Sequence, residues 1–500
     1  MGLVTPVAPV PVGQLGWVHF VGIGGAGMSG IARLLLARGV AVSGSDRAAS
    51  AQLDELAALG AVVHVGHAAA NVGQADTVVT TPSAIGPDNP ELAEARRRGI
   101  RVVPRAAVLA SIMIGKQGIA VSGTHGKTTT TSMLTTVLRH CGADPSYVIG
   151  GILAETGAGA AGGTGELFVA EADESDGSFL MLSPQTAVVT CIEAEHLDNY
   201  ENLAQIEATF AAFAGKIREG GLLVACRDDP GAAALAATAA ALPLRVRTYG
   251  ESAEADYQLT GVTGLGMATR MTVTPRVREL PSPADWVGGQ AGDAGRAGEP
   301  GGPPGPVTLT IEVPGRHNAL NAAAAFATAV ELGVPTRSAA RGLAAYRGVR
   351  RRMEPKGEAD GVRVLDSYAH HPTELAADLT AARDIAEGGR VIAVFQPHLY
   401  SRTRIFAAQF GAVLGLADEV LVLDVYAARE DPEPGVTGMI VAAEVPGGRG
   451  RFVPRAAAVP DAIAGLAKPG DLVLTMGAGD VTALGPMIVA ALRERDGVGP

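Results

Sequence analysis

The chain contains little cysteine, no long apolar run and no long run of Lys or Arg. Its three cysteines are widely spaced and odd in number, which excludes a disulfide framework or a paired metal-ligand motif and fits a reducing compartment. No segment approaches the ~20 consecutive apolar residues that a membrane-spanning helix needs. Residues 1–15 alternate Val with Pro and carry no basic residue, so they do not resemble a signal peptide. We therefore expect a cytoplasmic protein that does not bind membranes.

The chain is also poor in charge, since 18% of its residues are charged and the net charge is −11. An acidic chain without long runs of Lys or Arg is a poor candidate for nucleic-acid binding. Its 66 glycines and its high content of Ala and Val are typical of α/β proteins. A length of 500 residues suggests about three domains.

Short apolar stretches alternate with helical patterns along most of the chain, which predicts an α/β protein with parallel, doubly wound sheets. We expect a Rossmann-like domain at residues 1–115, a central α/β domain of the P-loop ATPase type at 116–348 and a second Rossmann-like domain at 349–500. Residues 281–306 are mostly Pro, Gly, Ala, Ser and acidic residues, which predicts a disordered insertion. The predicted strands are 17–21, 40–46, 61–65, 77–80, 101–103, 118–122, 166–170, 186–190, 221–225, 307–313, 362–365, 391–395, 419–423 and 472–476, with antiparallel strands within 259–277 and helices at 28–38 and 321–332.

The segment Gly123-Thr124-His125-Gly126-Lys127-Thr128 lies between a predicted strand and a predicted helix. Backbone N–H groups at such a helix start are unpaired and can bind a phosphate. Lys127 can reach the outer phosphates, and the Thr128 hydroxyl can bind Mg²⁺. Val121 stands where the generic P-loop has its first glycine, so this loop is a shorter variant. An ordinary strand-to-helix turn is the alternative.

The segment Gly22-Ile23-Gly24-Gly25-Ala26-Gly27 has the spacing of a dinucleotide-binding loop. Asp46 follows about 20 residues later at the end of a predicted strand, where an acid can bind ribose hydroxyls. The pattern predicts a ligand with a diphosphate but does not establish NAD, because any nucleoside diphosphate suits the same helix start. Tight packing of the helix on the strand is the alternative.

Two acidic segments follow predicted strands of the central domain. Glu171-Ala172-Asp173-Glu174-Ser175-Asp176 can supply the carboxylate oxygens that Mg²⁺ prefers near nucleotide phosphates. Glu193-Ala194-Glu195-His196-Leu197-Asp198 places one histidine among acids, where it could bind a second cation or serve a structural role. A solvated acidic loop is the alternative to a metal site.

Two further groups of polar residues have a chemical and a structural interpretation. Asn318 and Asn321 stand three residues apart at the start of an Ala-rich helix, and the residues alone favour helix capping over binding of an adenine edge. Segments 366–374 and 398–404 each follow a predicted strand, and their histidines and arginines suit a carboxylate or a developing oxyanion. A basic surface patch is the alternative.

Taken in order, these motifs resemble those of the Mur ligase family: residues 22–30, 123–129, 171–176, 193–198, 315–321 and 368–374. The resemblance covers nearly the whole chain outside the N-terminal tail and the 281–306 insertion. It implies that the three domains bind a UDP-linked substrate, ATP and an amino acid. It also implies that ATP phosphorylates the carboxylate of UDP-N-acetylmuramate and that the amine of L-alanine attacks the acyl phosphate, a step of peptidoglycan precursor synthesis. ATP, two Mg²⁺ ions and a monomer or weak homodimer are implied.

The resemblance assigns ATP-site roles to matching residues. Lys127 would stabilise the β- and γ-phosphates. Thr128 and Glu171 would hold one Mg²⁺, and Glu171 with His196 the second. The full implied ATP-binding set is Gly123, Thr124, His125, Gly126, Lys127, Thr128, Thr129, His317, Asn318, Asn321, Arg352 and Asp366.

The other two substrates receive residues in the same way. The UDP-sugar set is Gly22, Gly24, Gly25, Ala26, Gly27, Met28 and Asp46, with His67, Ser83 and Arg105 as weaker candidates. The alanine set is Tyr368, His370, His398, Arg402 and Arg404, and the implied catalytic residues are Lys127, Glu171, His196, His370 and Arg402.

Three positions depart from the family pattern. Glu195 stands where members usually carry Asp, and Cys191 stands where Asn is common, which bears on the second metal site. Leu399 follows His398 where many members have Arg, which leaves Arg402 and Arg404 as the expected cations of the alanine pocket.

Two other functions compete with the alanine ligase. A sister ligase attaches a recycled tripeptide to the same UDP-sugar, and the intact loop 22–27 favours the alanine enzyme over it. A regulator or dehydrogenase built on the first glycine loop would bind NAD without ligation, and it leaves the segment 123–128 unexplained.

Overall fold

The computed structural model describes residues 3–82, 84–196, 199–282, 286, 305–428 and 430–497. These residues form two compact units. Unit 1 contains residues 1–261, 271–310 and 320–347, and unit 2 contains residues 262–270, 311–319 and 348–500. Among the described residues, no helix has both the length and the apolar character needed to cross a bilayer.

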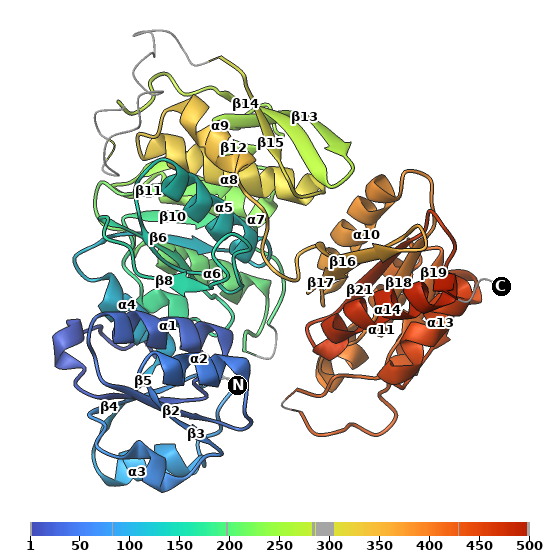
Figure 1. Ribbon diagram of the computed structural model, residues 1–500. Helices are drawn as coiled ribbons and strands as arrows, with labels where there is room; N and C mark the ends of the chain where they lie inside the picture. The colour runs from blue at the N-terminus through green and yellow to red at the C-terminus, as the bar shows by residue number, and fades with distance from the viewer. Residues whose placement is uncertain are drawn as a thin grey trace. The chain divides into compact units, whose positions relative to one another are not determined.

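The first sheet of unit 1 has five strands in the order β3-β2-β1-β4-β5, and all neighbouring strands are parallel (Figure 1). Parallel strands end at the same edge, and the strand order reverses between β1 and β4, which is where open α/β sheets bind ligands. The strands are β1 (Val18–Val21), β2 (Val42–Asp46), β3 (Val62–Val65), β4 (Thr77–Thr80) and β5 (Arg101–Pro104), and the helices are α1 (Ala26–Ala37), α2 (Ala51–Ala58), α3 (Pro90–Arg97) and α4 (Arg105–Met113).

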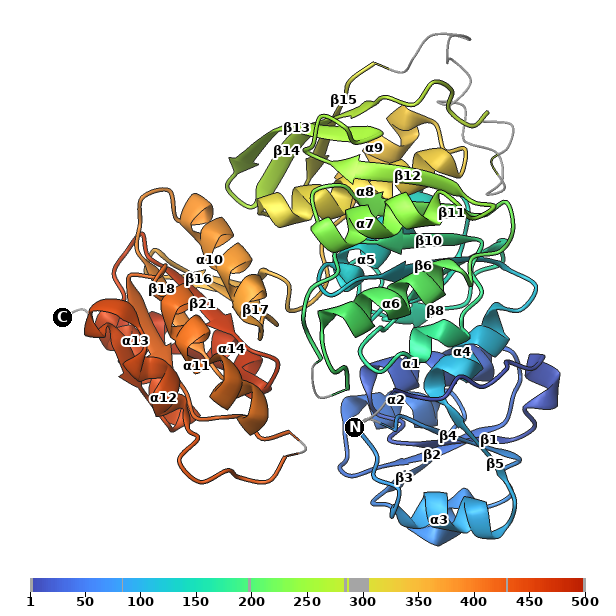
Figure 2. The same ribbon diagram turned by 180° about the vertical axis from the view of Figure 1, so that it is seen from behind.

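The second sheet has ten strands in the order β15-β14-β13-β12-β11-β10-β6-β9-β7-β8. Strand β6 lies between β9 and β10 and is parallel to both, so the loops that follow these three strands meet at one edge. Helix α5 covers one face of this parallel region, and α6 and α7 cover the other (Figures 1 and 2). The strands are β6 (Gln117–Ser122), β7 (Ser146–Val148), β8 (Ala160–Ala161), β9 (Leu167–Glu171), β10 (Thr186–Val189), β11 (Leu222–Cys226), β12 (Arg245–Gly250), β13 (Tyr257–Leu265), β14 (Ala268–Pro275) and β15 (Val307–Ile311), and the helices are α5 (Lys127–His140), α6 (Leu203–Ala214), α7 (Pro230–Ala239), α8 (Arg316–Glu331) and α9 (Thr336–Ala344).

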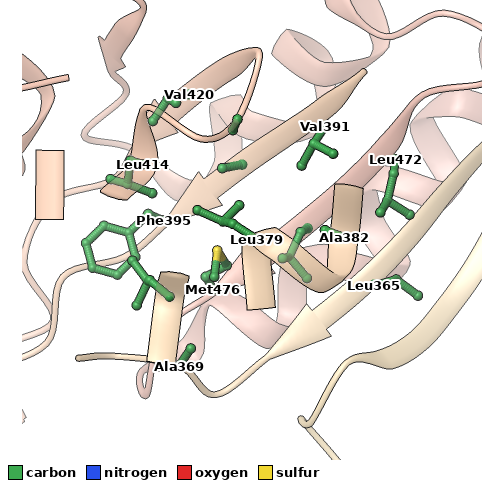
Figure 3. Close-up of a cluster of buried hydrophobic side chains, with 14 of the residues drawn as sticks. Leu365, Ala369, Leu379, Ala382, Val391, Phe395, Leu414, Val420, Leu472 and Met476 are labelled. Atoms are coloured by element: carbon green, nitrogen blue, oxygen red, sulfur yellow. The ribbon is translucent and has the colours of Figure 1, made fainter. Parts of the chain in front are cut away.

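Unit 2 contains a six-stranded sheet in the order β16-β17-β21-β18-β19-β20, parallel except for the β16–β17 pair. Alternate side chains of β18 enter two separate cores. Val391, Ala393 and Phe395 pack with residues of α10 to α12, and Ile392 and Val394 pack with residues of α13 and α14. Figure 3 shows Val391 and Phe395 near Leu379 of α10 and Leu414 of α11. The strands are β16 (Glu354–Ala359), β17 (Val362–Ser367), β18 (Val391–Phe395), β19 (Glu419–Val422), β20 (Gly450–Phe452) and β21 (Leu472–Met476), and the helices are α10 (Pro372–Ala386), α11 (Tyr400–Leu414), α12 (Gly438–Ala443), α13 (Val459–Leu466) and α14 (Leu484–Gly497).

The predicted fold class is confirmed, and the strands that were predicted agree with the observed ones within one or two residues at each end. Five strands, β7, β8, β12, β16 and β20, were not predicted. Helix α8 begins at Arg316 and not at Asn321. Gly315 has a φ of +102°, and the Asn318 side chain donates to the Pro314 carbonyl at 2.7 Å, so the helix begins one turn earlier than the Ala-rich run. Most of the predicted disordered insertion, residues 283–285 and 287–304, lies outside the described residues.

Candidate active site

The phosphate-loop segment joins β6 to α5 and has the conformation that its glycines permit. Gly123 and Gly126 have φ values of +133° and +83°, and Gly126 is the N-cap of α5. A Cβ on Gly126 would lie 2.5 Å from the Asn321 Oδ1 atom, so only glycine fits between α5 and α8 there. Thr124 accepts a hydrogen bond from the Glu193 backbone N–H at 2.9 Å, which ties the loop to the acidic segment after β10.

Lys127 folds back over its own loop. Its Nζ donates to the carbonyls of Gly123 and Thr124 at 2.6 and 3.1 Å and lies 2.8 Å from the Glu174 Oε1 atom. Burial opposes its charge, but the carboxylates of Glu174, Asp173 and Glu171 outweigh burial and raise the pKa of Lys127. The lysine is therefore a fixed cation beside the start of α5, where the first backbone N–H groups of a helix have no partner within the helix itself.

Thr128 and Glu171 form an oxygen pair next to this cation. The Thr128 hydroxyl donates to the Glu171 Oε2 atom at 2.9 Å, and the Gly150 backbone N–H donates to the same oxygen at 2.7 Å. A hydroxyl and a carboxylate are ligands that Mg²⁺ prefers. Across the described part of the chain, no group of three or more His, Cys, Asp or Glu is arranged to hold a metal ion.

His196 lies next to a residue that the sequence analysis did not select, Glu174. The His196 Nε2 atom is 3.6 Å from Glu174 and 3.8 Å from Glu195, and these two carboxylates raise the pKa of His196 although burial opposes protonation. The Glu174 Oε2 atom is buried without a hydrogen-bond partner among the described residues. The two departures that bear on the second metal site both make local contacts: Glu195 lies 3.8 Å from the His196 Nε2 atom, and the Cys191 Sγ atom accepts from the His125 N–H at 3.2 Å.

The two asparagines of α8 make different contacts. Asn321 is 7% exposed, and its Oδ1 accepts from the Thr130 hydroxyl at 3.2 Å on α5. In unit 2, Asn318 is bound to the Pro314 carbonyl, and the His317 Nε2 atom is 3.7 Å from Asp378. Burial lowers the pKa of His317 and raises that of Asp378, so both shifts favour the neutral forms.

The first glycine loop follows β1 at the point where the strand order reverses. Gly22 has a φ of +83° and donates to the Ser45 carbonyl at 2.8 Å, and the Gly24 N–H donates to the Asp46 Oδ2 atom at 2.8 Å. The loop and Asp46 are thus brought together, and the carboxylate positions the loop backbone. Gly25 is the N-cap of α1, and Ala26 is its first residue.

Arg105, at the start of α4, also reaches this loop. Its Nη1 atom lies where a Cβ on Gly27 would be, so the guanidinium contacts the first turn of α1. The Met28 side chain is 4% exposed and belongs to the core, which leaves only its backbone for a ligand. Ser83 lies outside the described residues.

His67 follows β3 at the same edge and has a defined hydrogen-bonding role. The Ser45 hydroxyl donates to the buried Glu91 Oε2 atom at 2.6 Å, so its oxygen accepts from the His67 Nδ1 atom at 2.8 Å. Hydrogen bonds from His19, Ser45, Asn71 and Ala68 outweigh the effect of burial and lower the pKa of Glu91 to about 2. The ionised carboxylate therefore holds His67 with its proton on Nδ1 and leaves Nε2 for a ligand.

In unit 2, the buried Asp366 side chain binds several donors. It accepts from the hydroxyls of Thr475 and Thr482, both at 2.7 Å, and lies 3.4 Å from Arg351 Nε. The Arg352 guanidinium lies over the Tyr368 ring at 5.7 Å. Arg351, which the sequence analysis did not select, lies closer to the same ring at 4.9 Å and contacts Asp366 itself.

Four aromatic rings form a continuous row at the carboxyl edge of this sheet. Tyr368 and His370 lie 5.3 Å apart, His370 and His398 6.1 Å, and His398 stacks on Tyr426 at 5.8 Å. The His370 Nδ1 atom donates to the Tyr368 carbonyl at 3.0 Å, and burial is the largest cause that lowers the pKa of His370 to about 3. His370 is therefore neutral, with the lone pair on Nε2.

The two predicted cations of this region differ. Arg402 is half-buried, and its charge contributes to the lowered pKa of His370, whereas Arg404 is exposed and pairs with Glu433 at 3.0 Å. Leu399 is 7% exposed and has a φ of +70° at the start of α11, so its side chain is part of the packing.

Four residues of these sites were not singled out from the sequence: Asp173, Glu174, Glu91 and Arg351. Asp173 and Glu174 lie inside a selected acidic segment, but nothing in their spacing ranks them against Glu171. Arg351 adjoins Arg352 in a run of three arginines, and the run does not tell which one faces Tyr368. Glu91 has a detectable signal, an acid beside Leu92 on the apolar side of a short helix.

Three family models match the chain. They are described as "Mur ligase family, catalytic domain" at residues 17–117, "Mur ligase middle domain" at 121–276 and "Mur ligase, glutamate ligase domain" at 351–479. Together they cover most of the sequence, in the order in which the three sheets occur. The chain belongs to the Mur ligase family.

Relatives and solved structures agree with this assignment. UDP-N-acetylmuramate–L-alanine ligases of Thermobifida fusca and Kineococcus radiotolerans are 54% and 52% identical, over 98% of this chain and 100% and 99% of theirs. The structure of a UDP-N-acetylmuramate–alanine ligase from Thermotoga maritima matches with a TM-score of 0.77 at 28% identity, covering 96% of this chain and 99% of that one. A murein peptide ligase from Psychrobacter arcticus shares the fold, with a TM-score of 0.67 at 22% identity and coverage of 95% and 98%.

Proposed function

We propose that this chain joins L-alanine to the carboxylate of UDP-N-acetylmuramate, with conversion of ATP to ADP and phosphate, in peptidoglycan precursor synthesis. The observation that carries the proposal is the 50–54% identity to alanine ligases over nearly the whole length. ATP transfers its γ-phosphoryl group to the muramate carboxylate, the alanine amine attacks the acyl phosphate, and phosphate leaves as the amide forms. Because no protein nucleophile is needed, the residues act by positioning and charge stabilisation.

Lys127 supports this chemistry from the phosphate loop. Its charge and the N–H groups at the α5 start face the place where triphosphate charge would lie, and they neutralise charge that develops during phosphoryl transfer. The loop from Gly123 to Thr129, with Asn321 packed against Gly126, forms the rest of the nucleotide site in this proposal. His317, Asn318, Arg352 and Asp366 remain proposed ATP ligands on the family resemblance alone.

Magnesium fits the residues that adjoin Lys127. Thr128 and Glu171 offer hard oxygen ligands, and the buried Glu174 Oε2 atom lacks a hydrogen-bond partner among the described residues. A bound Mg²⁺ would neutralise phosphate charge, with most of its ligands supplied by phosphates and water. Thr128 and Glu171 would hold one ion. Glu171 and His196 remain the proposed ligands of a second.

The proposed UDP-sugar and alanine sites lie at the carboxyl edges of the first sheet and of the six-stranded sheet. The loop from Gly22 to Met28 would carry the diphosphate at the α1 start, with Asp46 positioning the loop and His67, Ser83 and Arg105 contacting the ligand. Tyr368, His370, His398, Arg402 and Arg404 would surround the alanine. The neutral His370 would offer its Nε2 lone pair as a hydrogen-bond acceptor that orients the alanine amine, and its pKa of about 3 makes it a positioning group and not the base that keeps the proton.

The division into domains at residues 1–115, 116–348 and 349–500 also remains a proposal, as do the cytoplasmic location and the monomeric or weakly dimeric state. Each proposed domain contains one of the three sheets, and the proposed roles of UDP-sugar binding, ATP binding and amino-acid binding follow that order.

A phosphate-release assay separates this function from its nearest competitor. The purified protein is supplied with ATP, Mg²⁺ and UDP-N-acetylmuramate, together with either L-alanine or the L-alanyl-γ-D-glutamyl-diaminopimelate tripeptide. We expect phosphate release with alanine and none above background with the tripeptide. Release with the tripeptide alone would show that the chain is a peptide-recycling ligase.

A further inference from the structure

An ion pair connects the start of α4, which contacts the first glycine loop, to the acidic loop beside the phosphate site. The Arg105 Nη2 atom at the start of α4 donates to the Asp173 Oδ2 atom at 2.6 Å. The second carboxylate oxygen of Asp173 accepts from the Ser175 backbone N–H at 3.1 Å. Both oxygens of Asp173 are therefore engaged, and the carboxylate is fixed in direction.

The second terminal nitrogen of the Arg105 guanidinium, Nη1, lies against α1. Its Nη1 atom lies in the space that a Cβ on Gly27 would occupy, against the first turn of the helix. The α1 N-cap, Gly25, supplies no side-chain hydrogen bond to this turn. One guanidinium thus directs one nitrogen to Asp173 and another to the start of a helix.

Asp173 is also close to the ATP-site residues in sequence and in space. Glu171, two residues before it, accepts from Thr128, and Glu174, one residue after it, pairs with Lys127 at 2.8 Å. Segment 171–174 therefore contacts Arg105 on one side and the phosphate loop on the other.

We propose that Asp173 is a positioning residue, which holds Arg105 against the first turn of α1 so that the guanidinium binds an anionic group of the UDP-sugar. The inference rests on the proposed function, in which the α1 start receives that ligand. An arginine that is already oriented by a carboxylate loses less conformational freedom when it binds an anion, so the ion pair strengthens UDP-sugar binding without touching the reacting atoms. Without Asp173 the guanidinium keeps its charge but loses its direction.

Steady-state kinetics of the full-length enzyme test this role. We expect Asp173→Asn to raise KM for UDP-N-acetylmuramate about tenfold, which is several times more than any change in the KM for ATP. Asp144→Asn is the control, because Asp144 also accepts from a backbone N–H, that of Thr164, but its second donor is the Thr164 hydroxyl and not an arginine. An unchanged KM for the UDP-sugar, or a rise in the KM for ATP alone, would overturn the inference.

A double-mutant cycle adds a readout that a purely structural role would not change. If Asp173 acts through Arg105, the double variant Arg105→Ala/Asp173→Ala should have the same KM for the UDP-sugar as Arg105→Ala alone. Additive effects would contradict the inference. Calorimetric binding of UDP-N-acetylmuramate to the unmodified protein separates the two proposals, because its absence would refute the proposed function, whereas normal binding with an additive cycle would refute only the role of Asp173.

Discussion

Lys127 is the residue on which the proposed chemistry depends most. In the structure its ammonium group binds two carbonyls of its own loop and Glu174, so it is held at the α5 start. Burial opposes its charge, but the surrounding carboxylates outweigh burial and raise its pKa, so it is charged at neutral pH. A permanent cation at this place acts on phosphate charge and not as a base.

We expect Lys127→Ala to abolish acyl-phosphate formation and leave UDP-sugar affinity within about twofold, because the two glycine loops follow different sheets. Rapid-quench detection of the acyl phosphate and calorimetric titration of UDP-N-acetylmuramate measure the two effects. Lys216→Ala, at an exposed position after α6, is the control. Turnover in the Lys127→Ala variant would refute the assignment.

Position 27 requires a glycine because of a contact with a residue outside its own helix. An added Cβ would collide with the Arg105 Nη1 atom, so the guanidinium would have to leave the first turn of α1. We expect Gly27→Ala to raise KM for the UDP-sugar about tenfold with little change in melting temperature. Gly13→Ala, where nothing lies within 4 Å of the added Cβ, should have no effect on either quantity. If the two variants behave alike, the Gly27–Arg105 contact does not serve binding.

At the scale of elements, Glu91 joins α3 to β1 and β2. The His19 Nε2 atom on β1 lies 3.4 Å from Glu91, and the Ser45 hydroxyl on β2 donates to it at 2.6 Å. The carboxylate is fully buried, so these donors replace the water that it loses on folding. The first sheet is therefore held to α3 by a charged group as well as by apolar packing.

Glu91→Gln should destabilise the protein in a pH-dependent way. The pKa of Glu91 falls from 4.5 to about 2 on folding, so its charge contributes about 3 kcal/mol above pH 4.5, and the contribution is lost as pH falls through 2. Scanning calorimetry should therefore show a deficit at pH 7 that shrinks to less than half at pH 3. Glu94→Gln, about one turn later on α3 and paired with Arg97 at the surface, should change little at either pH. A pH-independent deficit would mean that packing, and not charge, causes the loss.

At the scale of the whole molecule, the 281–306 insertion is the segment that the proposed function does not need. Trp286 is 9% exposed, and its backbone N lies 3.0 Å from the position of a Cβ on Gly333, so it belongs to the packed part of unit 1. We expect deletion of residues 288–302, which spares Trp286, to leave ligase activity within about twofold. A large loss of activity in a deletion variant with an unchanged melting temperature would show that the insertion takes part in function.

The sequence by itself determined the fold class, the positions of most strands and the motifs that follow the ends of the predicted strands. Alternation of apolar strands with helical patterns requires parallel sheets, and parallel strands must end at one edge, so the motifs after β1, β6, β9 and β10 could be placed from local information. Only the tertiary structure decided the partners: Glu174 with Lys127, Asn321 with Gly126, and Asp173 with Arg105. These contacts join residues 47 to 195 positions apart, and no local pattern encodes which buried charge will meet which. The reason is physical, because a strand forms from its own residues, whereas a buried ion pair forms only where packing has removed the water that both charges would otherwise keep.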